Sequence, residues 1–399
     1  MTILTLTKVD VGMMEDVGTS ANQLVQLDSN AKIPAVDGSL LTGMSTGLSG
    51  SSDPTLSTNP SGGVGTKFKN TTDGEMFICT DATAGENVWI NVGAGSGRIP
   101  EPFTFQGTQY GYVAGGYNLQ SGAHRDEIQK YSFTSDGNAT DVGNTLLEQH
   151  YRCGGTGTTH GYTLGGANPS NGRIEKWPYA SDTNSTEVGT LYVCTHGTSS
   201  SATDGYIFCA SGASNTNVIS RTATASDADA IDWANCVNFN THNTAGCTSE
   251  TYGYRAQGEG GVSPYPQSDD IEKYPFASQT NATDVGSLTI ARYGAGSTSS
   301  TSYGFCVGQT PNTGEQMDRI DRFSFASDGN ATDHADLNYR AGTQCGTSTA
   351  DYGYYAGGNM SGPYTNNISK IAYSSTGTAT DVGDLVIGVG YAGATGANY

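Results

Sequence analysis

The sequence predicts an all-β fold, in which a six-bladed β-propeller follows a small, extended, β-containing N-terminal region. A phrase of the type Tyr-Gly-Tyr, followed by small residues and Gly, recurs six times from Tyr110 to the C-terminus. The copies are anchored at the second aromatic residue of each phrase: Tyr112, Tyr162, Tyr206, Tyr254, Phe305 and Tyr354. Their mean spacing of about 48 residues is typical of propeller blades. Each copy divides into segments of strand length, and none is long enough for a helix.

The first hundred residues carry no copy of this repeat. Residues 1–43 hold too few apolar side chains to bury a core alone, so we expect them to order on copies of themselves or on a larger assembly. Residues 44–65 are rich in Ser, Gly, Thr and Pro and predict a linker. Residues 66–100 predict a small β-hairpin module, with two strands between Met76 and Val92.

The first copy of the repeat shows how a blade is built. Tyr110 to Gly116, Ile128 to Phe133 and Asp141 to Leu147 are each of strand length. Ser135 to Thr140 contains Asp-Gly and Asn, which supply the backbone conformations of a tight hairpin turn. Three strands per copy are therefore predicted directly.

A fourth strand is predicted in the Gly-, Ser-, Thr- and Cys-rich stretch before each aromatic phrase, as in Cys153 to Gly157. Small side chains suit an innermost strand that is crowded around a central axis. Tyr391 to Tyr399 matches such a stretch but no further copy follows. We expect this strand to complete the blade that begins near Tyr110 and to close a propeller over residues 101–399. The alternative is seven blades, with Met76 to Val92 as an irregular extra one.

Composition excludes several classes of protein. The chain of 399 residues has 18 Lys and Arg against 38 Asp and Glu, and its net charge of −20 opposes binding to a phosphate backbone. No run of apolar residues is long enough for a membrane span, and the first residues lack the features of a secretory signal. The eight Cys are expected to be buried reduced thiols that act as small hydrophobic side chains.

The recurring polar residues favour structure over chemistry. Asp141, Asp284, Asp333 and Asp381 occupy one register of the repeat, which favours a turn or strand-capping role over catalysis. The six His lie in different registers and show no metal-ligand spacing. We therefore predict no catalytic residue, no metal site and no cofactor.

The loop after the Gly-Gly of each copy varies in length and content, whereas the hairpin turn is nearly constant. Propeller topology places these loops and the connections between blades on one face, where function on a rigid repeat scaffold tends to reside. The candidate ligand-binding residues in these loops are Tyr117, Asn118, Arg125, Asn168, Tyr265, Asn312, Tyr364 and Asn366. Amides pair with sugar hydroxyls and aromatic rings stack on pyranose faces, so this composition suits glycan recognition.

Two resemblances add to this interpretation. Ser20 to Asp28, Lys32 to Leu41 and Gly74 to Gly93 resemble stretches of tail fibre and appendage proteins of tailed bacteriophages, notably those of marine cyanobacteria. The repeat resembles kelch repeats through its period and through double glycines such as Gly115-Gly116 and Gly357-Gly358. It departs from the kelch pattern because the Trp late in each blade is replaced by Ile-x-Lys-Tyr.

The resemblance to appendage proteins implies a virion protein that is made in the host cytoplasm and stands on the tail or another external site. Its partners would be other virion proteins at the N-terminal region and a host surface glycan or protein at the propeller. Such fibres are homo-oligomers, usually trimers. Two alternatives stay open: a purely structural spacer or decoration protein, and a propeller enzyme that degrades polysaccharide with two converging carboxylates.

Overall fold

The computed structural model describes residues 47–92 and 106–397, apart from 119, 168–171, 193–197, 202–204, 211–216, 239–240, 261–266, 295, 309–315 and 361–363. The chain divides into two units between Glu101 and Pro102. All regular elements of the described residues are strands, so the all-β prediction is confirmed. These residues include no helix capable of crossing a membrane.

The N-terminal unit is a four-stranded sheet in the order β1-β2-β3-β4. Its strands are β1 (Leu48–Gly50), β2 (Lys67–Asn70), β3 (Met76–Asp81) and β4 (Val88–Asn91). β1 runs parallel to β2, and the other pairs are antiparallel. Alternate residues of the strands bury a small core of Phe68, Phe77, Cys79 and Trp89.

The expected linker is part of this folded unit from residue 47 onward. Asp53 accepts a hydrogen bond of 2.7 Å from the Asn70 side chain, and Asn87 Nδ2 donates to Leu56 O at 2.7 Å and to Asn59. These amide contacts bind a Ser- and Gly-rich stretch to the sheet, which composition alone does not reveal. The expected strands between Met76 and Val92 are present as β3 and β4 of this sheet, and residues 1–46 lie outside the described residues.

The C-terminal unit contains six antiparallel sheets among its described residues, and each has four main strands. Listed from the innermost strand outward, they are β29 (Gly393–Ala397), β5 (Tyr110–Asn118), β6 (Ala123–Ser132), β7 (Thr140–Asn144); β8 (Cys153–Thr156), β9 (His160–Leu164), β10 (Arg173–Pro178), β11 (Thr186–Thr190); and β12 (Thr198–Ser201), β13 (Tyr206–Ala210), β14 (Val218–Ala223), β15 (Ile231–Asn235). The other three are β17 (Ala245–Thr248), β18 (Tyr252–Gly260), β19 (Gln267–Pro275), β20 (Thr283–Ser287); β21 (Ser297–Ser299), β22 (Tyr303–Cys306), β23 (Met317–Ser324), β24 (Thr332–Ala341); and β25 (Cys345–Ser348), β26 (Tyr352–Ala356), β27 (Asn367–Ala372), β28 (Thr380–Asp384). The short β16 (Thr241–His242) also pairs with β18.

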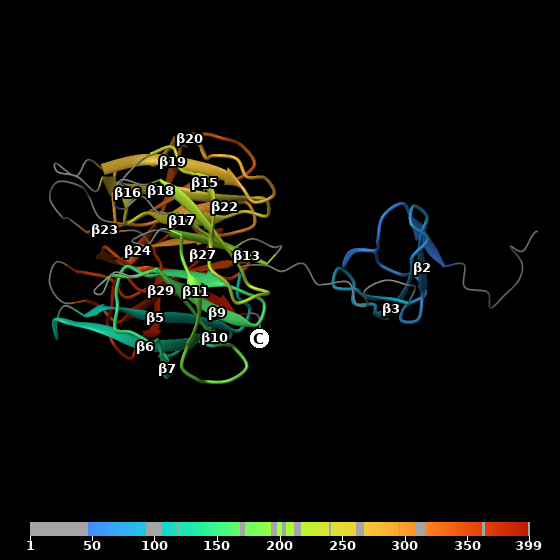
Figure 1. Ribbon diagram of the computed structural model, residues 1–399, viewed down its shortest axis with the longest axis horizontal. Coiled ribbons are helices and arrows are strands. Elements are labelled where there is room, and N and C mark those ends of the chain that lie inside the picture. The colour runs from blue at the N-terminus through green and yellow to red at the C-terminus, as the bar shows by residue number, and fades with distance from the viewer. Residues whose placement is uncertain are drawn as a thin grey trace, which may run out of the picture. The chain divides into compact units, whose positions relative to one another are not determined.

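The sheets have a propeller-like arrangement. In Figure 1 the sheet of β18, β19 and β20 lies at the top of the unit, whereas β5, β6 and β7 lie at the bottom. The innermost strands touch in the order β29, β8, β12, β17, β21 and β25, and β25 touches β29 again. β29 also pairs antiparallel with β5, from Gly393 opposite Ala114 to Ala397 opposite Tyr110. The expected pairing of the C-terminal strand with the strand that begins at Tyr110 is thus present.

The register of the third copy differs from the sequence-based assignment. In every sheet the anchor aromatic on the second strand lies opposite a Lys or Arg on the third strand, as Tyr112 lies opposite Lys130. In the third copy Phe208 lies opposite Arg221, whereas Tyr206 lies opposite Ala223. Phe208 is therefore the equivalent anchor, two residues after the predicted one.

The hydrophobic core lies between neighbouring sheets. Tyr131 and Phe133 of the first sheet pack in one cluster with Cys345 and Tyr354 of the last sheet. The rings of Phe133 and Tyr354 lie 4.7 Å apart. Similar clusters join the other sheets, so each sheet buries its faces against the next.

The repeated turn holds neighbouring sheets together at their outer edge. Lys370 of the last sheet pairs with Asp136 in the turn of the first, at 3.0 Å, and Asn138 Oδ1 of the same turn accepts a hydrogen bond from Asp384 N. Equivalent ion pairs are Lys130 with Asp182, Lys176 with Asp227, and Lys273 with Asp328. The turn recurs in the sequence because it makes the same contact with a neighbouring sheet several times.

The recurring Asp residues cap local backbone, as the sequence predicts. Asp141, Asp284 and Asp381 each accept a hydrogen bond from the backbone N–H of the glycine two residues later, at 3.1 to 3.2 Å. Asp333 instead pairs with Arg319 at 3.1 Å. The predicted capping role is confirmed for Asp141, Asp284 and Asp381, whereas Asp333 makes an ion pair.

Candidate functional site

Described residues of the variable loops of the first, second and sixth copies lie at the same end of the C-terminal unit as connections between its sheets, and we call this end the loop face. Isolated β-bridges join loop and connection in three places: Tyr117 with Gly390, Ala167 with His150, and Asn359 with Gly342. The expected gathering of loops and connections on one face is therefore confirmed for the described residues of the first, second and sixth copies.

Six rings from separate segments meet on the loop face and form what we call the ring cluster. Its members are Tyr117 of β5, His124 of β6, His150 and Tyr151 of the β7–β8 connection, Tyr364 of the β26–β27 connection and Tyr391 of the β28–β29 connection. The imidazoles of His124 and His150 stack with centroids 4.6 Å apart. Tyr151 and Tyr391 lie 4.4 Å apart, and Tyr117 meets Tyr364 edge to face at 6.1 Å.

His150, Tyr364 and Tyr391 of the ring cluster are uncharged near pH 7. Burial, with a smaller contribution from His124, lowers the pKa of His150 to about 4. Burial raises the pKa of Tyr364 to about 12 and raises that of Tyr391 further. The buried Nδ1 atoms of His124 and His150 have no hydrogen-bond partner among the described residues. Uncharged aromatic rings are suited to stacking against a ligand that carries no strong charge.

Unusual backbone conformations hold two of these rings in place. Tyr151 and Tyr391 have φ values of 58° and 56°, and Thr343 has 64°, in the left-handed region that non-glycine residues rarely adopt. Each lies two residues before an innermost strand. Such strain costs about 1 to 3 kcal/mol per residue and concentrates at functional sites.

Backbone hydrogen bonds link these turns from one sheet to the next. Thr343 N donates to Gly294 O at 2.8 Å, Tyr391 N donates to Thr343 O at 3.1 Å, and Arg152 N donates to Tyr391 O at 3.3 Å. Each bond fixes one left-handed turn against its neighbour. The positions of Tyr151 and Tyr391 on the loop face are consequently determined by the backbone of adjacent sheets.

The structure brings together only some of the predicted ligand-binding residues. Tyr117 and Tyr364 both belong to the ring cluster, and Asn366 is exposed beside Tyr364. Asn168, Tyr265 and Asn312 lie outside the described residues.

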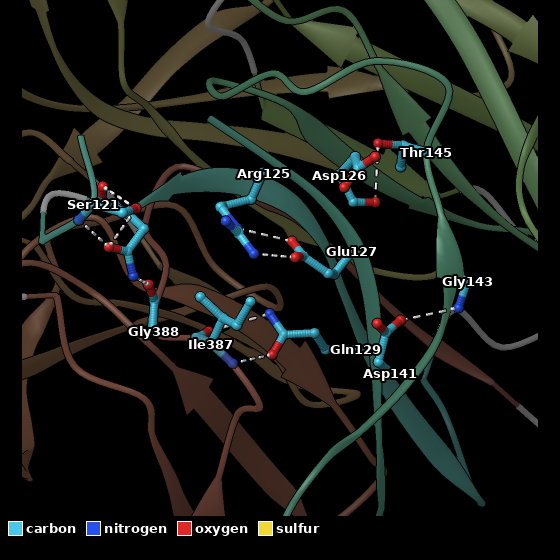
Figure 2. A network of polar contacts seen from close by, with 11 residues as sticks. Ser121, Arg125, Asp126, Glu127, Gln129, Asp141, Gly143, Thr145, Ile387 and Gly388 are labelled. Atoms are coloured by element: carbon cyan, nitrogen blue, oxygen red, sulfur yellow. Dashed lines mark hydrogen bonds and ion pairs between the residues drawn. The ribbon is translucent and has the colours of Figure 1, made fainter. Parts of the chain in front are cut away.

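Asn118 and Arg125 are engaged within the protein, and Figure 2 shows Arg125 beside Glu127. Asn118 is buried, its Nδ2 donates to Gly388 O at 2.7 Å, and its Oδ1 accepts from Ser121 N at 2.9 Å. Arg125 forms an ion pair with Glu127 on the same strand. Asn118 therefore braces the β5–β6 loop against the β28–β29 connection, and Arg125 meets a ligand only with its charge already balanced.

Sequence reasoning missed four members of the ring cluster: His124, His150, Tyr151 and Tyr391. The His residues were set aside because their repeat registers differ, and Tyr391 was considered only as the start of the C-terminal strand. Their common signal was that each stands beside a variable loop or in a connection between copies. Only topology shows that those segments meet.

A hollow lies among the innermost strands of the C-terminal unit, and we call it the axial cavity. This axial cavity has a volume of about 70 Å³, and its walls carry the hydroxyls of Thr156, Thr248, Thr298, Ser299, Thr347, Ser348 and Thr395. Hydroxyls of the innermost strands form hydrogen bonds with neighbouring innermost strands. Ser297 Oγ donates to Gly246 O at 2.8 Å, and Ser348 Oγ accepts from Ser299 N at 2.9 Å. The polar lining therefore has a structural explanation.

The chain joins the C-terminal unit at the end opposite the loop face. Gln106 is buried, and its Nε2 donates to Ser299 O at 3.1 Å. Gly107 N donates to Ser348 O at 2.8 Å. Ser299 and Ser348 are the last residues of β21 and β25, whose first residues lie toward the loop face.

One acidic group in the N-terminal unit has metal-ligand character. Oxygens of Asp53, Asp73 and Glu75 lie within 4.8 Å of one another. The Asn70 side chain donates to Asp53 at 2.7 Å and to Asp73 at 2.8 Å. These hydrogen bonds account for the arrangement as a polar turn.

Comparison with known proteins gives no assignment. The chain matches no protein-family model, and a search of curated proteins finds no match either. Function must therefore be argued from the fold and the loop face alone.

Proposed function

We propose that the six sheets are the blades of a closed, kelch-like propeller and that its loop face binds a glycan of a host cell envelope. The protein that carries it would be a virion appendage, a tail fibre or related fibre. Antiparallel sheets of near-equal size and the cycle of contacts among innermost strands support the propeller. The resemblance of residues 18–93 to phage appendage proteins supports the virion assignment.

The ring cluster is the observation that carries the binding proposal. Tyr151 and Tyr391 occupy strained conformations on the face where the copies differ most. Asn243 and Gly294 occupy the equivalent left-handed positions before two other innermost strands. A purely structural turn at this point therefore does not require tyrosine. Retaining tyrosine there at an energetic cost is explained when the rings contact a ligand, and neutral aromatic rings suit the faces of sugar rings.

The connection of the chain supports the same arrangement. Gln106 and Gly107 anchor the propeller at the end opposite the loop face. The first described residues of the C-terminal unit thus lie away from the loop face. In a homo-oligomer, several shallow sites engage one cell together, which raises avidity without new contacts.

A binding measurement with matched variants tests this proposal. Labelled full-length protein is titrated onto candidate host cells, in parallel with Tyr151→Asn and with Tyr352→Ala. Asn tolerates the left-handed backbone, so the first variant removes the ring and keeps the turn. Tyr352 is also exposed but begins β26 at the opposite end. We expect Tyr151→Asn to weaken binding about tenfold, equivalent to about 1.4 kcal/mol, and Tyr352→Ala to leave it unchanged.

The alternatives give different results in the same experiment. Equal binding by all three proteins would contradict recognition through the ring cluster. No binding by folded, oligomeric protein would favour a structural spacer or decoration. Release of reducing sugar from host polysaccharide would favour the hydrolase or lyase.

A further inference from the structure

Two pairs of cysteines meet between neighbouring sheets of the C-terminal unit. Cys153 Sγ on β8 lies 3.4 Å from Cys209 Sγ on β13. Cys247 Sγ on β17 lies 3.9 Å from Cys306 Sγ on β22. All four side chains are buried, and none of them forms a disulfide. In both pairs the innermost strand of one sheet meets the second strand of the next sheet along the chain.

The second-strand cysteines of the two pairs are equivalent in the repeat. Cys209 and Cys306 each follow the anchor aromatic, Phe208 and Phe305. Their partners lie on the innermost strands of two different sheets, Cys153 opposite Leu164 and Cys247 opposite Tyr254. These repeat positions are two residues apart, so the two side chains point to the same face of their strands. A coincidence of buried small residues explains a repeated contact of this kind less readily than a single one.

We propose that Cys153–Cys209 and Cys247–Cys306 are latent disulfide sites that link neighbouring sheets when the protein meets a peroxide. A disulfide has an S–S distance of about 2.05 Å, so the sulfurs need to approach by about 1.4 Å in the first pair and about 1.9 Å in the second. Rotation of the side chains and a small shift of one sheet supply such a movement.

The chemistry balances with hydrogen peroxide as oxidant. One thiolate attacks a peroxide oxygen, the O–O bond breaks, and a sulfenic acid and water form. The second thiol attacks that sulfur, which forms the S–S bond and releases a second water. Each pair thus loses two electrons and two protons, and one peroxide is reduced to two molecules of water.

The surroundings predict slow oxidation that accelerates with pH. The contact with Cys153, together with burial, raises the pKa of the Cys209 thiol, and the contact with Cys247 does the same for Cys306. Little thiolate is present at pH 7, and more forms as the pH rises. The reduced state described here is therefore the expected product of synthesis in a reducing cytoplasm.

Other cysteines of the chain serve as internal controls. Cys79 and Cys345 donate to backbone carbonyls, of Asp81 and Ala392, and Cys236 is buried in another cluster. All three are as buried as the paired thiols. If the short distance between two sulfurs decides which cysteines form disulfides, these three will stay unlinked.

Peptide mapping of the folded, full-length protein tests the proposal. The protein is treated with hydrogen peroxide at pH 8.5, quenched, alkylated under denaturing conditions and analysed by mass spectrometry. Cys209→Val and Cys306→Val are treated in parallel, because Val113 occupies the same repeat position in the first copy. Unfolding midpoints of the untreated variants verify that they are folded.

We expect two linked peptide pairs in the natural protein, only Cys247–Cys306 in Cys209→Val, and only Cys153–Cys209 in Cys306→Val. The doubly linked protein should melt roughly 5 °C higher, because each link restricts the unfolded chain. Thiols that persist, sulfinic acids without linked peptides, or links that involve Cys79, Cys236 and Cys345 as often would overturn the proposal.

Discussion

At the scale of single residues, His150 makes stability depend on pH. Its folded-state pKa of about 4 lies below the value of about 6.5 expected in the unfolded chain. The unfolded chain therefore takes up the proton first, and stability present above pH 6.5 is lost as the pH falls toward 4. Thermal unfolding followed from pH 8 to pH 4 should show a falling midpoint in this window.

The variant His150→Phe isolates this contribution, since it keeps a ring beside His124 and Tyr151 and removes the titrating group. Burial also lowers the pKa of His160 and His334, so the informative quantity is the difference between the two proteins. We expect the variant to lose less of its stability between pH 6.5 and pH 4. Parallel pH profiles would contradict the proposed burial of neutral His150.

The sequence predicted part of the site at this scale. Tyr117 and Tyr364 were found because they stand in loops that differ between copies. His124, His150 and Tyr391 were missed because they become neighbours only through pairing of the first, second and last sheets. Asn118 illustrates the opposite error: an amide suited to sugar hydroxyls is already satisfied by Gly388 and Ser121.

At the scale of elements, close approach between sheets demands glycine in the outermost strands. Gly286 has a φ of 155°, and a Cβ there would lie 2.3 Å from Gly329 O of the next sheet. Gly286→Ala should therefore destabilise the protein by roughly 2 to 4 kcal/mol, measured by denaturant unfolding. Gly377→Ala is the control, because its Cβ would meet only Ser375 Oγ at 3.5 Å. A similar effect of both substitutions would refute this packing.

Buried ion pairs distinguish the inner contacts from the outer ones. Arg255 and Glu272 pair at 2.6 Å, and each side chain is only 2% exposed. Glu272 also accepts hydrogen bonds of 3.0 Å from the backbone N–H groups of Val237 and Asn238, in the connection from the preceding sheet. Similar buried pairs join Arg152 to Glu175 and Arg292 to Asp321. Each carboxylate thus binds an arginine and a neighbouring connection at once.

Glu272→Gln should lower the free energy of unfolding by about 3 kcal/mol, because it leaves the Arg255 charge buried without a counter-ion. Asp328→Asn breaks the pair between Lys273 and Asp328, in which the Asp328 side chain is 58% exposed. This substitution should lower the free energy of unfolding by less than about 1 kcal/mol. Urea titration of both variants measures the difference. Equal costs would show that the buried pair has no special role.

Strand-length segments and turn residues were sufficient to predict these elements, because alternation and Asp-Gly or Asn turns are local signals. The third copy shows where local signals fail. Gly205-Tyr206 imitates the Gly-Tyr of the repeated phrase, but Phe208 is the residue that pairs with Arg221. The β1 strand was not predicted for a similar reason, because it forms by pairing with β2, which is distant in the sequence.

At the scale of the whole molecule, β29 should control cooperativity. It pairs with β5 and contacts both β8 and β25, so its loss unpairs the edge of β5 and removes a packing neighbour of two other sheets. Deletion of residues 390–399 should abolish the cooperative thermal transition of the C-terminal unit, observed by circular dichroism. Deletion of residues 398 and 399 alone leaves β29 complete and serves as the control. A truncated protein that melts normally would reject closure by the C-terminal strand.

Strand-length segments indicated an all-β chain, and the period of the repeat predicted a propeller-like fold. Neither property could place the ring cluster, which depends on how the first and last copies meet. The contacts of Gln106 and Gly107 with the ends of β21 and β25 were equally hidden, because nothing in either residue type indicates them.

The most direct test of the central claim is competition for adsorption. Purified full-length protein is added to candidate host cells before the intact particle, and unadsorbed particles are counted. We predict saturable inhibition by the natural protein, with a rightward shift of about tenfold for Tyr151→Asn. Undiminished adsorption at saturating, folded and oligomeric protein would contradict recognition of the host through the loop face.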